Sequence, residues 1–272
     1  MPTRIAQTVR AERPVPGGRR LELTFGRERE DARVPAILLL PDGAAPPAPA
    51  AVLLHGFSSR KEQMAEMVGA GLLRQGIASL AIDLPLHGER ITEGAGSTWG
   101  GGMWERAVDR SAFGNPIALA GAWRTALRDA RLALGYLGAR PEVDRERLAL
   151  VGYSMGSFLG VQVAADEPGV RALVLAAGGD LPEGTPFARL VRTLADPLRA
   201  VRRFDGKPLL MVHGRRDPTV IAAQAQRLFD AAMEPKELRW YDAGHYLPPQ
   251  AIDDAARWLV ARLGEGARRA AG

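Results

Sequence analysis

Short apolar runs alternate with longer amphipathic stretches over most of the chain. Six runs have the length of buried strands, at residues 51–54, 77–82, 148–151, 172–176, 209–212 and 238–241. Between them, apolar residues recur with helical spacing at residues 61–75, 117–137, 155–165, 221–233 and 251–263. This alternation predicts an α/β fold in which helices cover both faces of a mostly parallel sheet.

Two further apolar runs, at residues 20–25 and 34–40, precede these six and are separated by only a short charged stretch. This spacing favours an antiparallel pair of strands at the N-terminal end of the sheet, which makes eight predicted strands in all. The length of 272 residues and an ordinary apolar content of 46% suit a single α/β domain over residues 1–272.

Two connections are longer than the usual two to six residues, at 84–116 and 178–207. The second contains an apolar stripe at helical spacing, formed by Phe187, Leu190, Val191 and Leu194. We predict that this insert is a small helical lid over a substrate pocket. The alternative is a surface helix that only packs on the core.

The sequence GYSMG at residues 152–156 lies where an apolar run ends and a helical stretch begins. A serine at such a junction is often a helix N-cap, but a cap does not require both glycines. The spacing suits a sharp strand-to-helix turn that lifts the Ser154 hydroxyl clear of the sheet. The helix that follows directs its first amides toward whatever this oxygen attacks. The motif therefore predicts a nucleophile for acyl transfer.

Other polar side chains also follow the predicted strands. In a parallel sheet, catalytic groups collect beyond the carboxyl ends of the strands. The side chains at these positions are His55, Asp83, Ser154, His213, Asp217 and His245. This set contains a nucleophile, a base and an acid that could orient the base.

These motifs resemble the α/β-hydrolase superfamily, and in particular its compact esterases and dienelactone-hydrolase-like members. The resemblance extends over about residues 20–263 and rests on HGF at 55–57, GYSMG at 152–156, HGRRD at 213–217 and GH at 244–245. It implies the α/β-hydrolase fold, the chain order nucleophile, acid, histidine, and catalysis without a cofactor. Dienelactone hydrolases use a cysteine nucleophile, whereas this chain has no cysteine and carries serine in the motif.

In this order the catalytic residues are predicted to be Ser154, Asp217 and His245. The other three histidines precede Asp217 in the chain, so His245 remains as the general base. Asp217 is the preferred acid because it begins a loop just past a predicted strand. The alternative acids are Asp196, Asp205 and Asp242.

Two backbone amides are predicted to bind the oxyanion that forms during acyl transfer. The Met155 amide follows from the turn itself, and the resemblance points to the Phe57 amide as the second donor. We expect His55 to be a hydrogen-bonded core residue. His87, in the stretch DLPLHGER, is expected to be structural as well.

Some large side chains of the two long connections are predicted to line an acyl pocket: Trp99, Met103, Trp104, Phe187 and Leu190. The alternative for the tryptophans is that they only anchor a long loop by burying aromatic area.

The composition narrows the possible partners. The formal charge is +5, but the arginines are scattered among acidic residues, so we expect no nucleic-acid partner. No apolar segment is long enough for a secretory signal or a membrane span, which predicts a cytoplasmic protein. The absence of cysteine excludes thiolate metal sites, and no pair of His or Asp residues has metal-ligand spacing on one helix, so no metal is expected.

We therefore predict hydrolysis of a small-molecule carboxylic ester through an acyl-enzyme intermediate. An acyltransferase or a thioesterase would use the same three residues and stays open as an alternative. A ligand-binding receptor on the same fold is a third interpretation, because a fold does not fix a function. The sequence does not predict the oligomeric state.

Overall fold

The computed structural model describes residues 5–43, 47–91, 116–181, 192–193, 195–204 and 206–270. The chain divides into two compact units, Met1–Glu146 and Arg147–Gly272, and each is described by itself. Within the described residues, no helix combines the length and the apolar character needed to cross a lipid bilayer.

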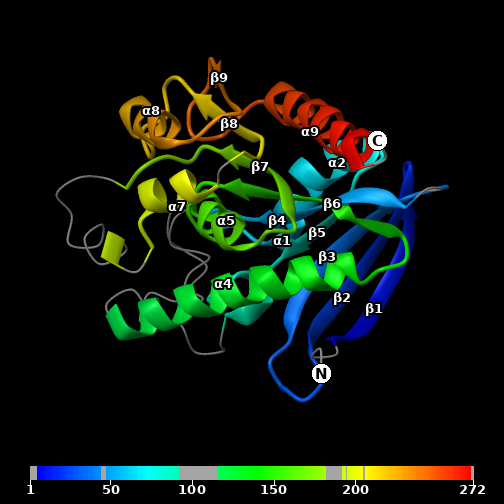
Figure 1. The fold of residues 1–272 in the computed structure, drawn as a ribbon. Coiled ribbons are helices and arrows are strands. Elements are labelled where there is room, and N and C mark those ends of the chain that lie inside the picture. Colours follow the sequence, from blue (N-terminus) through cyan, green and yellow to red (C-terminus); the bar gives the residue numbers. More distant parts are fainter. Residues whose placement is uncertain are drawn as a thin grey trace. The chain divides into compact units, whose positions relative to one another are not determined.

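The strands of unit 1 are β1 (Ile5–Val15), β2 (Gly18–Arg27), β3 (Val34–Pro41), β4 (Ala48–Leu54) and β5 (Ala78–Ile82). Their order in the sheet is β1-β2-β3-β5-β4 (Figure 1). The pair β4 and β5 is parallel, and the other neighbouring pairs in this unit are antiparallel. The predicted antiparallel pair at the N-terminal end is confirmed as β2 and β3.

The prediction of eight strands is wrong, because β1 adds a ninth strand to the described part of the chain. Most side chains of β1 are exposed, so its sequence lacks the apolar run that marked the other strands. Its backbone nevertheless pairs with β2 from Ile5 to Val15, with one irregularity between Val9 and Ala11. An edge strand of this kind is held by hydrogen bonds rather than by burial, which hydrophobic patterning does not detect.

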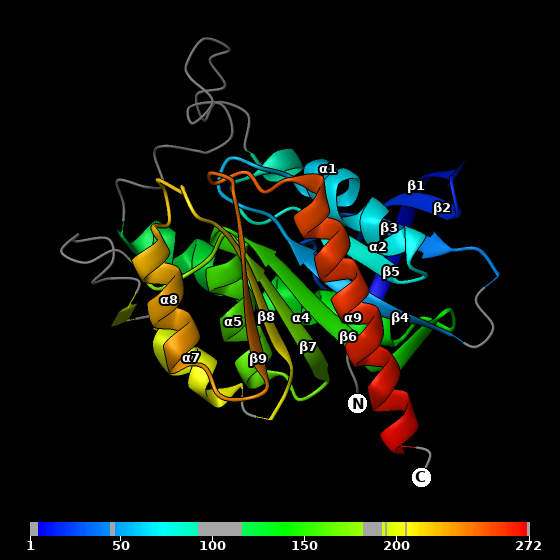
Figure 2. The ribbon, with the colours of Figure 1, turned by 90° about the horizontal axis from the view of Figure 1, so that it is seen from above.

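Helices cover both faces of the unit 1 sheet. One face carries a continuous helical segment made of α1 (Lys61–Met64), the π-helical turn η1 (Ala65–Gly69) and α2 (Ala70–Arg74), which contacts β3, β4 and β5. The other face carries α4 (Pro116–Gly138), which contacts β4 and β5 (Figures 1 and 2). A short 3-10 turn, η2 (Gly88–Arg90), follows β5.

Unit 2 contains most of β6 (Val143–Tyr153), followed by β7 (Val170–Ala176), β8 (Leu209–Gly214) and β9 (Lys236–Tyr241). These four strands are neighbours in chain order, and β7 is parallel to β6, β8 to β7 and β9 to β8. The helices are α5 (Met155–Asp166), α7 (Pro197–Arg203), α8 (Ala222–Ala231) and α9 (Pro249–Ala270). The helix α5 packs on β7 from one side and α9 from the other (Figure 2).

The central strands form the core of each unit. Val52, Leu53 and Leu54 of β4 and Leu173 of β7 have no exposed surface. Burial of one such side chain contributes about 1.5–3 kcal/mol, so the strands form a rigid platform for the loops at their carboxyl ends. The α9 helix continues past the predicted end at residue 263, because Gly264 is tolerated within a helix that is already formed.

Candidate active site

The turn between β6 and α5 has the strained geometry that the GYSMG motif predicts. Ser154 has a φ of 50° and a ψ of −114°, a left-handed φ that favours glycine. Its amide donates to the Ala176 carbonyl at 2.8 Å, and the Ser157 amide donates to the Ser154 carbonyl at 2.8 Å. A Cβ atom at Gly152 would lie 2.3 Å from the Gly156 carbonyl oxygen. Glycine at 152 therefore permits the close approach of strand and helix that holds Ser154 in this conformation.

Ser154, His245 and Asp217 form one continuous hydrogen-bonded chain within unit 2. The Ser154 Oγ lies 2.9 Å from His245 Nε2, and His245 Nδ1 lies 2.8 Å from Asp217 Oδ2. With a proton on Nδ1, the ring donates to the carboxylate and accepts from the serine hydroxyl. The three residues lie beyond the carboxyl ends of β6, β8 and β9, as the strand-end argument predicts.

The surroundings of Asp217 keep its side chain ionised. Burial alone raises the pKa of this carboxyl, but hydrogen bonds from His245 and from two backbone amides outweigh it and lower the pKa below its usual value. Those amides belong to Thr219 and Val220, which lie 2.8 and 3.0 Å from Asp217 Oδ1. One oxygen is thus held by the backbone, which leaves the other aligned on the imidazole.

His213 shapes the loop that carries Asp217. Its ring is fully buried, and Nε2 lies 2.8 Å from the Val220 carbonyl oxygen, which fixes a proton on that nitrogen. Burial lowers the pKa of His213 and keeps it neutral. The His213 side chain therefore joins the first residue of the loop 213–220 to the last one. Sequence reasoning noticed the HGRRD motif but assigned no role to this histidine.

Tyr153, directly before the nucleophile position, holds the loop that carries His245. Its hydroxyl donates to the His245 carbonyl at 2.7 Å and accepts from the Leu247 amide at 3.0 Å. Burial raises the pKa of Tyr153 to about 12, so the phenol keeps the proton that it donates. The ring also meets the His245 ring edge-on at 6.2 Å. The side chain of Tyr153, the neighbour of Ser154 in the chain, thus binds the backbone of the loop that carries His245.

The three alternative acids differ sharply from Asp217. The Asp242 side chain is 80% exposed and pairs with Arg216, and Asp196 accepts a hydrogen bond from the Leu198 amide as the N-cap of α7. Asp205 lies outside the described residues. Of the described candidates, only Asp217 contacts His245.

In unit 1, His55 orients the peptide that precedes the predicted oxyanion donor. The buried ring donates from Nδ1 to the Gly56 carbonyl at 2.7 Å and accepts from the Leu84 amide at 3.0 Å. Burial lowers the pKa of His55 to about 3, so it stays neutral in this tautomer. The carbonyl and amide of a trans peptide point in opposite directions, so the Phe57 amide points away from the ring.

His87 has the structural surroundings expected from the sequence. Its Nδ1 lies 2.8 Å from the Pro85 carbonyl oxygen, and its ring packs edge-on against Phe57 at 5.8 Å. Burial lowers the pKa of His87, so the ring is neutral. The two histidines His55 and His87 also contact each other, with ring centroids 5.0 Å apart. Together they support the loop that carries Phe57.

Met155, the other predicted oxyanion donor, is the first residue of α5, where a helix leaves its amides without helical partners. The predicted pocket-lining residues lie outside the described residues, namely Trp99, Met103, Trp104, Phe187 and Leu190. No three His, Cys, Asp or Glu side chains among the described residues converge in a way that could hold a metal ion.

Sequence comparison finds relatives over part of the chain. The uncharacterized protein Rv2307c of Mycobacterium tuberculosis is 32% identical over 131 residues, which is 46% of this chain and 47% of that protein. The chain thus spans about half the length of the curated relatives it matches.

Two solved structures resemble almost the whole chain. A cold-adapted esterase from an Arctic intertidal metagenomic library is 21% identical, with a TM-score of 0.66 over 92% of this chain and 97% of that one. Acetyl xylan esterase 1 from a Thermoanaerobacterium species is 19% identical, with a TM-score of 0.70 over 96% and 88%. These likenesses show that the chain has the α/β-hydrolase fold.

The model of the dienelactone hydrolase family matches residues 34–251, a range that includes Phe57, Ser154, Asp217 and His245. This range is well over half of the chain, and the described strands and helices within it have the fold seen in the esterase structures. By sequence and by fold, this chain belongs to the dienelactone hydrolase family.

Proposed function

We propose that this protein is a serine hydrolase that cleaves small-molecule carboxylic esters. The observation that carries the proposal is the hydrogen-bonded chain from Ser154 through His245 to Asp217. Membership of a hydrolase family supports hydrolysis as the reaction, and the esterase structures of the same fold favour an ester substrate. We also propose that residues 1–272 form a single domain.

Acylation begins at the Ser154 oxygen. His245 removes the hydroxyl proton through Nε2 as the oxygen attacks the ester carbonyl, and the imidazolium that forms is stabilised by the Asp217 carboxylate. The same imidazolium then gives its proton to the leaving alcohol. The products of this half-reaction are a free alcohol and an acyl group on Ser154.

Deacylation repeats these proton transfers with water. His245 removes a proton from a water molecule that attacks the acyl carbonyl, and it then returns a proton to the Ser154 oxygen. The carboxylic acid leaves and the free enzyme is restored. Every proton in the cycle passes through Nε2 of His245, because Nδ1 is bound to Asp217.

The oxyanion of each tetrahedral intermediate is proposed to bind the Met155 and Phe57 amides. A donor of this kind contributes about 2.7–4 kcal/mol of transition-state stabilisation. The support for Met155 is its place at the start of α5, and the support for Phe57 is the Gly56 peptide fixed by His55. The pair stays a proposal that rests on the family pattern and on each loop's own geometry.

The direct test is covalent labelling by a fluorophosphonate together with turnover of p-nitrophenyl acetate, butyrate and octanoate. We expect one phosphonyl group per chain, found by mass spectrometry on the peptide that contains Ser154, and loss of turnover in proportion to labelling. The order of the three rates reports the length of acyl chain that is accepted. Labelling at another residue, or turnover that survives full labelling, would contradict the proposal.

Tyr153→Phe is expected to lower kcat/KM for p-nitrophenyl acetate about tenfold, because loss of two buried hydrogen bonds frees the His245 loop. The KM is expected to change less than kcat, since the affected group acts on the reacting oxygen. Tyr241→Phe is the matched control, because the Tyr241 hydroxyl bonds to Asp254 at 2.7 Å, away from His245. Equal losses of kcat/KM in the two variants would show that Tyr153 only stabilises the fold.

A further inference from the structure

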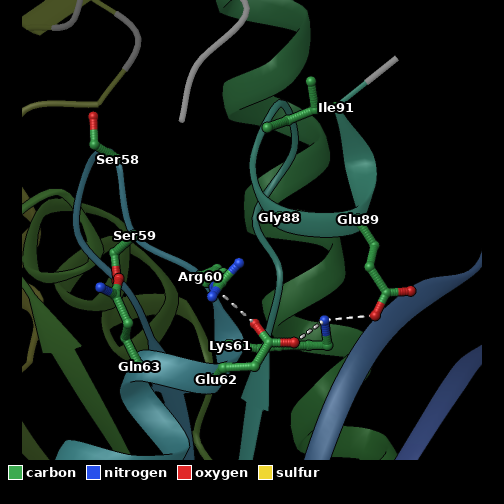
Figure 3. Close-up of a pocket in the computed structure, with 9 residues that line it drawn as sticks. All are labelled: Ser58, Ser59, Arg60, Lys61, Glu62, Gln63, Gly88, Glu89 and Ile91. Atoms are coloured by element: carbon green, nitrogen blue, oxygen red, sulfur yellow. Dashed lines mark hydrogen bonds and ion pairs between the residues drawn. The ribbon is translucent and has the colours of Figure 1, made fainter. Parts of the chain in front are cut away.

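A pocket with a volume of about 370 Å³ lies in unit 1, lined by residues 58–63 together with Gly88, Glu89 and Ile91 (Figure 3). Its charged side chains pair with one another. Lys61 Nζ lies 2.7 Å from a carboxylate oxygen of Glu62 and 2.7 Å from one of Glu89. Arg60 lies 3.5 Å from Glu62. These ion pairs account for the charged lining without a ligand.

In unit 2, a large exposed aromatic residue directly follows the proposed general base. Tyr246 is 60% exposed, whereas the side chain of His245 is only 10% exposed and Leu247 is buried. The rings of Tyr246 and His245 meet nearly edge-on, with centroids 6.1 Å apart and an angle of 73° between their planes. Single exposed apolar side chains are common on proteins, so exposure alone assigns no role to Tyr246. Its place beside the imidazole is the informative feature.

The backbone of Tyr246 is held on both sides by one buried side chain. The Tyr153 hydroxyl donates to the His245 carbonyl at 2.7 Å and accepts from the Leu247 amide at 3.0 Å. Two prolines follow Leu247, and the second of them begins α9. Proline fixes its own φ, so this part of the loop has little freedom. An aromatic side chain on such a backbone can bind a ligand at a low cost in conformational entropy.

The proposed reaction places the alcohol portion of the ester on the His245 side of Ser154. The acyl carbon binds Ser154 Oγ, which lies 2.9 Å from His245 Nε2. The leaving oxygen takes its proton from the same Nε2, so it must come within about 2.6–3.2 Å of that nitrogen. A six-membered ring joined to this oxygen through one carbon is large enough to reach from Nε2 to the Tyr246 ring. All of these protein groups belong to unit 2.

We propose that Tyr246 binds the alcohol portion of the ester and that the preferred alcohols carry an aromatic ring. This inference rests on the proposed ester hydrolysis and adds the class of alcohol. Two aromatic rings attract each other more strongly than an aromatic and a saturated ring of similar size, because their quadrupoles add to the buried area. The contact ends when the alcohol leaves. Tyr246 therefore acts in acylation and has no part in the attack of water on the acyl-enzyme.

The test compares benzyl acetate with cyclohexylmethyl acetate, which share the acyl group and differ in the aromaticity of the ring, with acetate release as the readout. In Tyr246→Leu, the ratio of kcat/KM for benzyl acetate to kcat/KM for cyclohexylmethyl acetate is expected to fall about fivefold from its wild-type value. The intrinsic reactivities of the two esters cancel, because the ratio is compared between variants. Equal ratios in Tyr246→Leu and the wild type would overturn the inference while the hydrolase remained.

Two further variants show whether the aromatic ring is responsible. Tyr246→Phe retains the ring and is expected to retain the wild-type ratio. Met233→Ala is the matched control, because Met233 is 47% exposed and precedes the amino end of β9, whereas His245 follows the carboxyl end. Its ratio is expected to equal that of the wild type. A fivefold fall in Met233→Ala as well would overturn the assignment to Tyr246.

Deacylation separates alcohol binding from a role in positioning His245. Both acetates give the same acetyl-enzyme on Ser154, and its hydrolysis, followed by rapid quench and mass spectrometry, is expected to keep its wild-type rate in Tyr246→Leu within about twofold. A displaced His245 would slow both half-reactions. Equal slowing of acylation and deacylation would therefore overturn the inference. Absence of acetate release by the wild type, with no fluorophosphonate labelling, would instead overturn the proposed function and this inference with it.

Discussion

Replacement of Ser154 by alanine is expected to lower kcat for p-nitrophenyl acetate by at least about 10³-fold, because it removes the atom that carries the acyl group in the proposed mechanism. The backbone of the turn makes its hydrogen bonds through the Ser154 amide and carbonyl, which alanine retains. The variant is therefore expected to fold, which circular dichroism and a thermal melt check. Initial rates at substrate saturation measure the loss of kcat.

Ser157→Ala is the control for this substitution. Ser157 lies in the first turn of α5, and its hydroxyl donates to the Gly152 and Ala176 carbonyls at 2.8 and 2.9 Å. Loss of these bonds is expected to lower the melting temperature, while kcat stays within about tenfold of the wild type. If Ser154→Ala kept the wild-type rate, the Ser154 hydroxyl would not be the nucleophile and the proposed function would fall.

Asp217→Asn is expected to lower kcat about 10⁴-fold, because an amide neither fixes the imidazole tautomer nor stabilises its charged form. The amide side chain still accepts from the Thr219 and Val220 amides, so the loop keeps its shape. The KM is expected to change little, since Asp217 is buried behind His245. Steady-state kinetics on p-nitrophenyl butyrate measure both parameters.

Asp242→Asn is the matched control, an aspartate three residues before His245 with a side chain that is 80% exposed. Its ion pair with Arg216 is solvent-exposed, so its loss is expected to change kcat by less than about threefold. A larger loss in Asp242→Asn than in Asp217→Asn would show that the acid was assigned to the wrong residue. Together, the two variants separate the role of the buried carboxylate from a general effect of charge near the site.

The sequence predicted that the Ser154, Asp217 and His245 side chains lie together because each of them has a local signal. Ser154, Asp217 and His245 each follow an apolar run, and the carboxyl ends of parallel strands converge on one edge of a sheet. The strained φ of Ser154 was likewise implied by two glycines that are near it in the chain. Strand pairing then brings together residues as far apart as 91 positions.

Features that depend on side-chain packing were not predictable in this way. The Tyr153 hydroxyl bonds to a carbonyl 92 positions later in the chain, and the identity of Tyr153 within GYSMG does not reveal that partner. Lys61 forms ion pairs with Asp83 and Glu89. Glu89 in turn binds Arg10, which lies 79 positions earlier in the chain. The strand β1 was missed because backbone pairing leaves no mark on a polar sequence.

The order of the strands in unit 2 also determines when the site is completed during synthesis. The strands β6 to β9 are neighbours in the sheet in their chain order, which is also the order in which the ribosome releases them. Ser154 and Asp217 can take their places once β8 has paired, but His245 arrives only with the loop after β9. In the proposed mechanism, a nascent chain therefore lacks its general base until β9 and the loop that carries His245 have been synthesised.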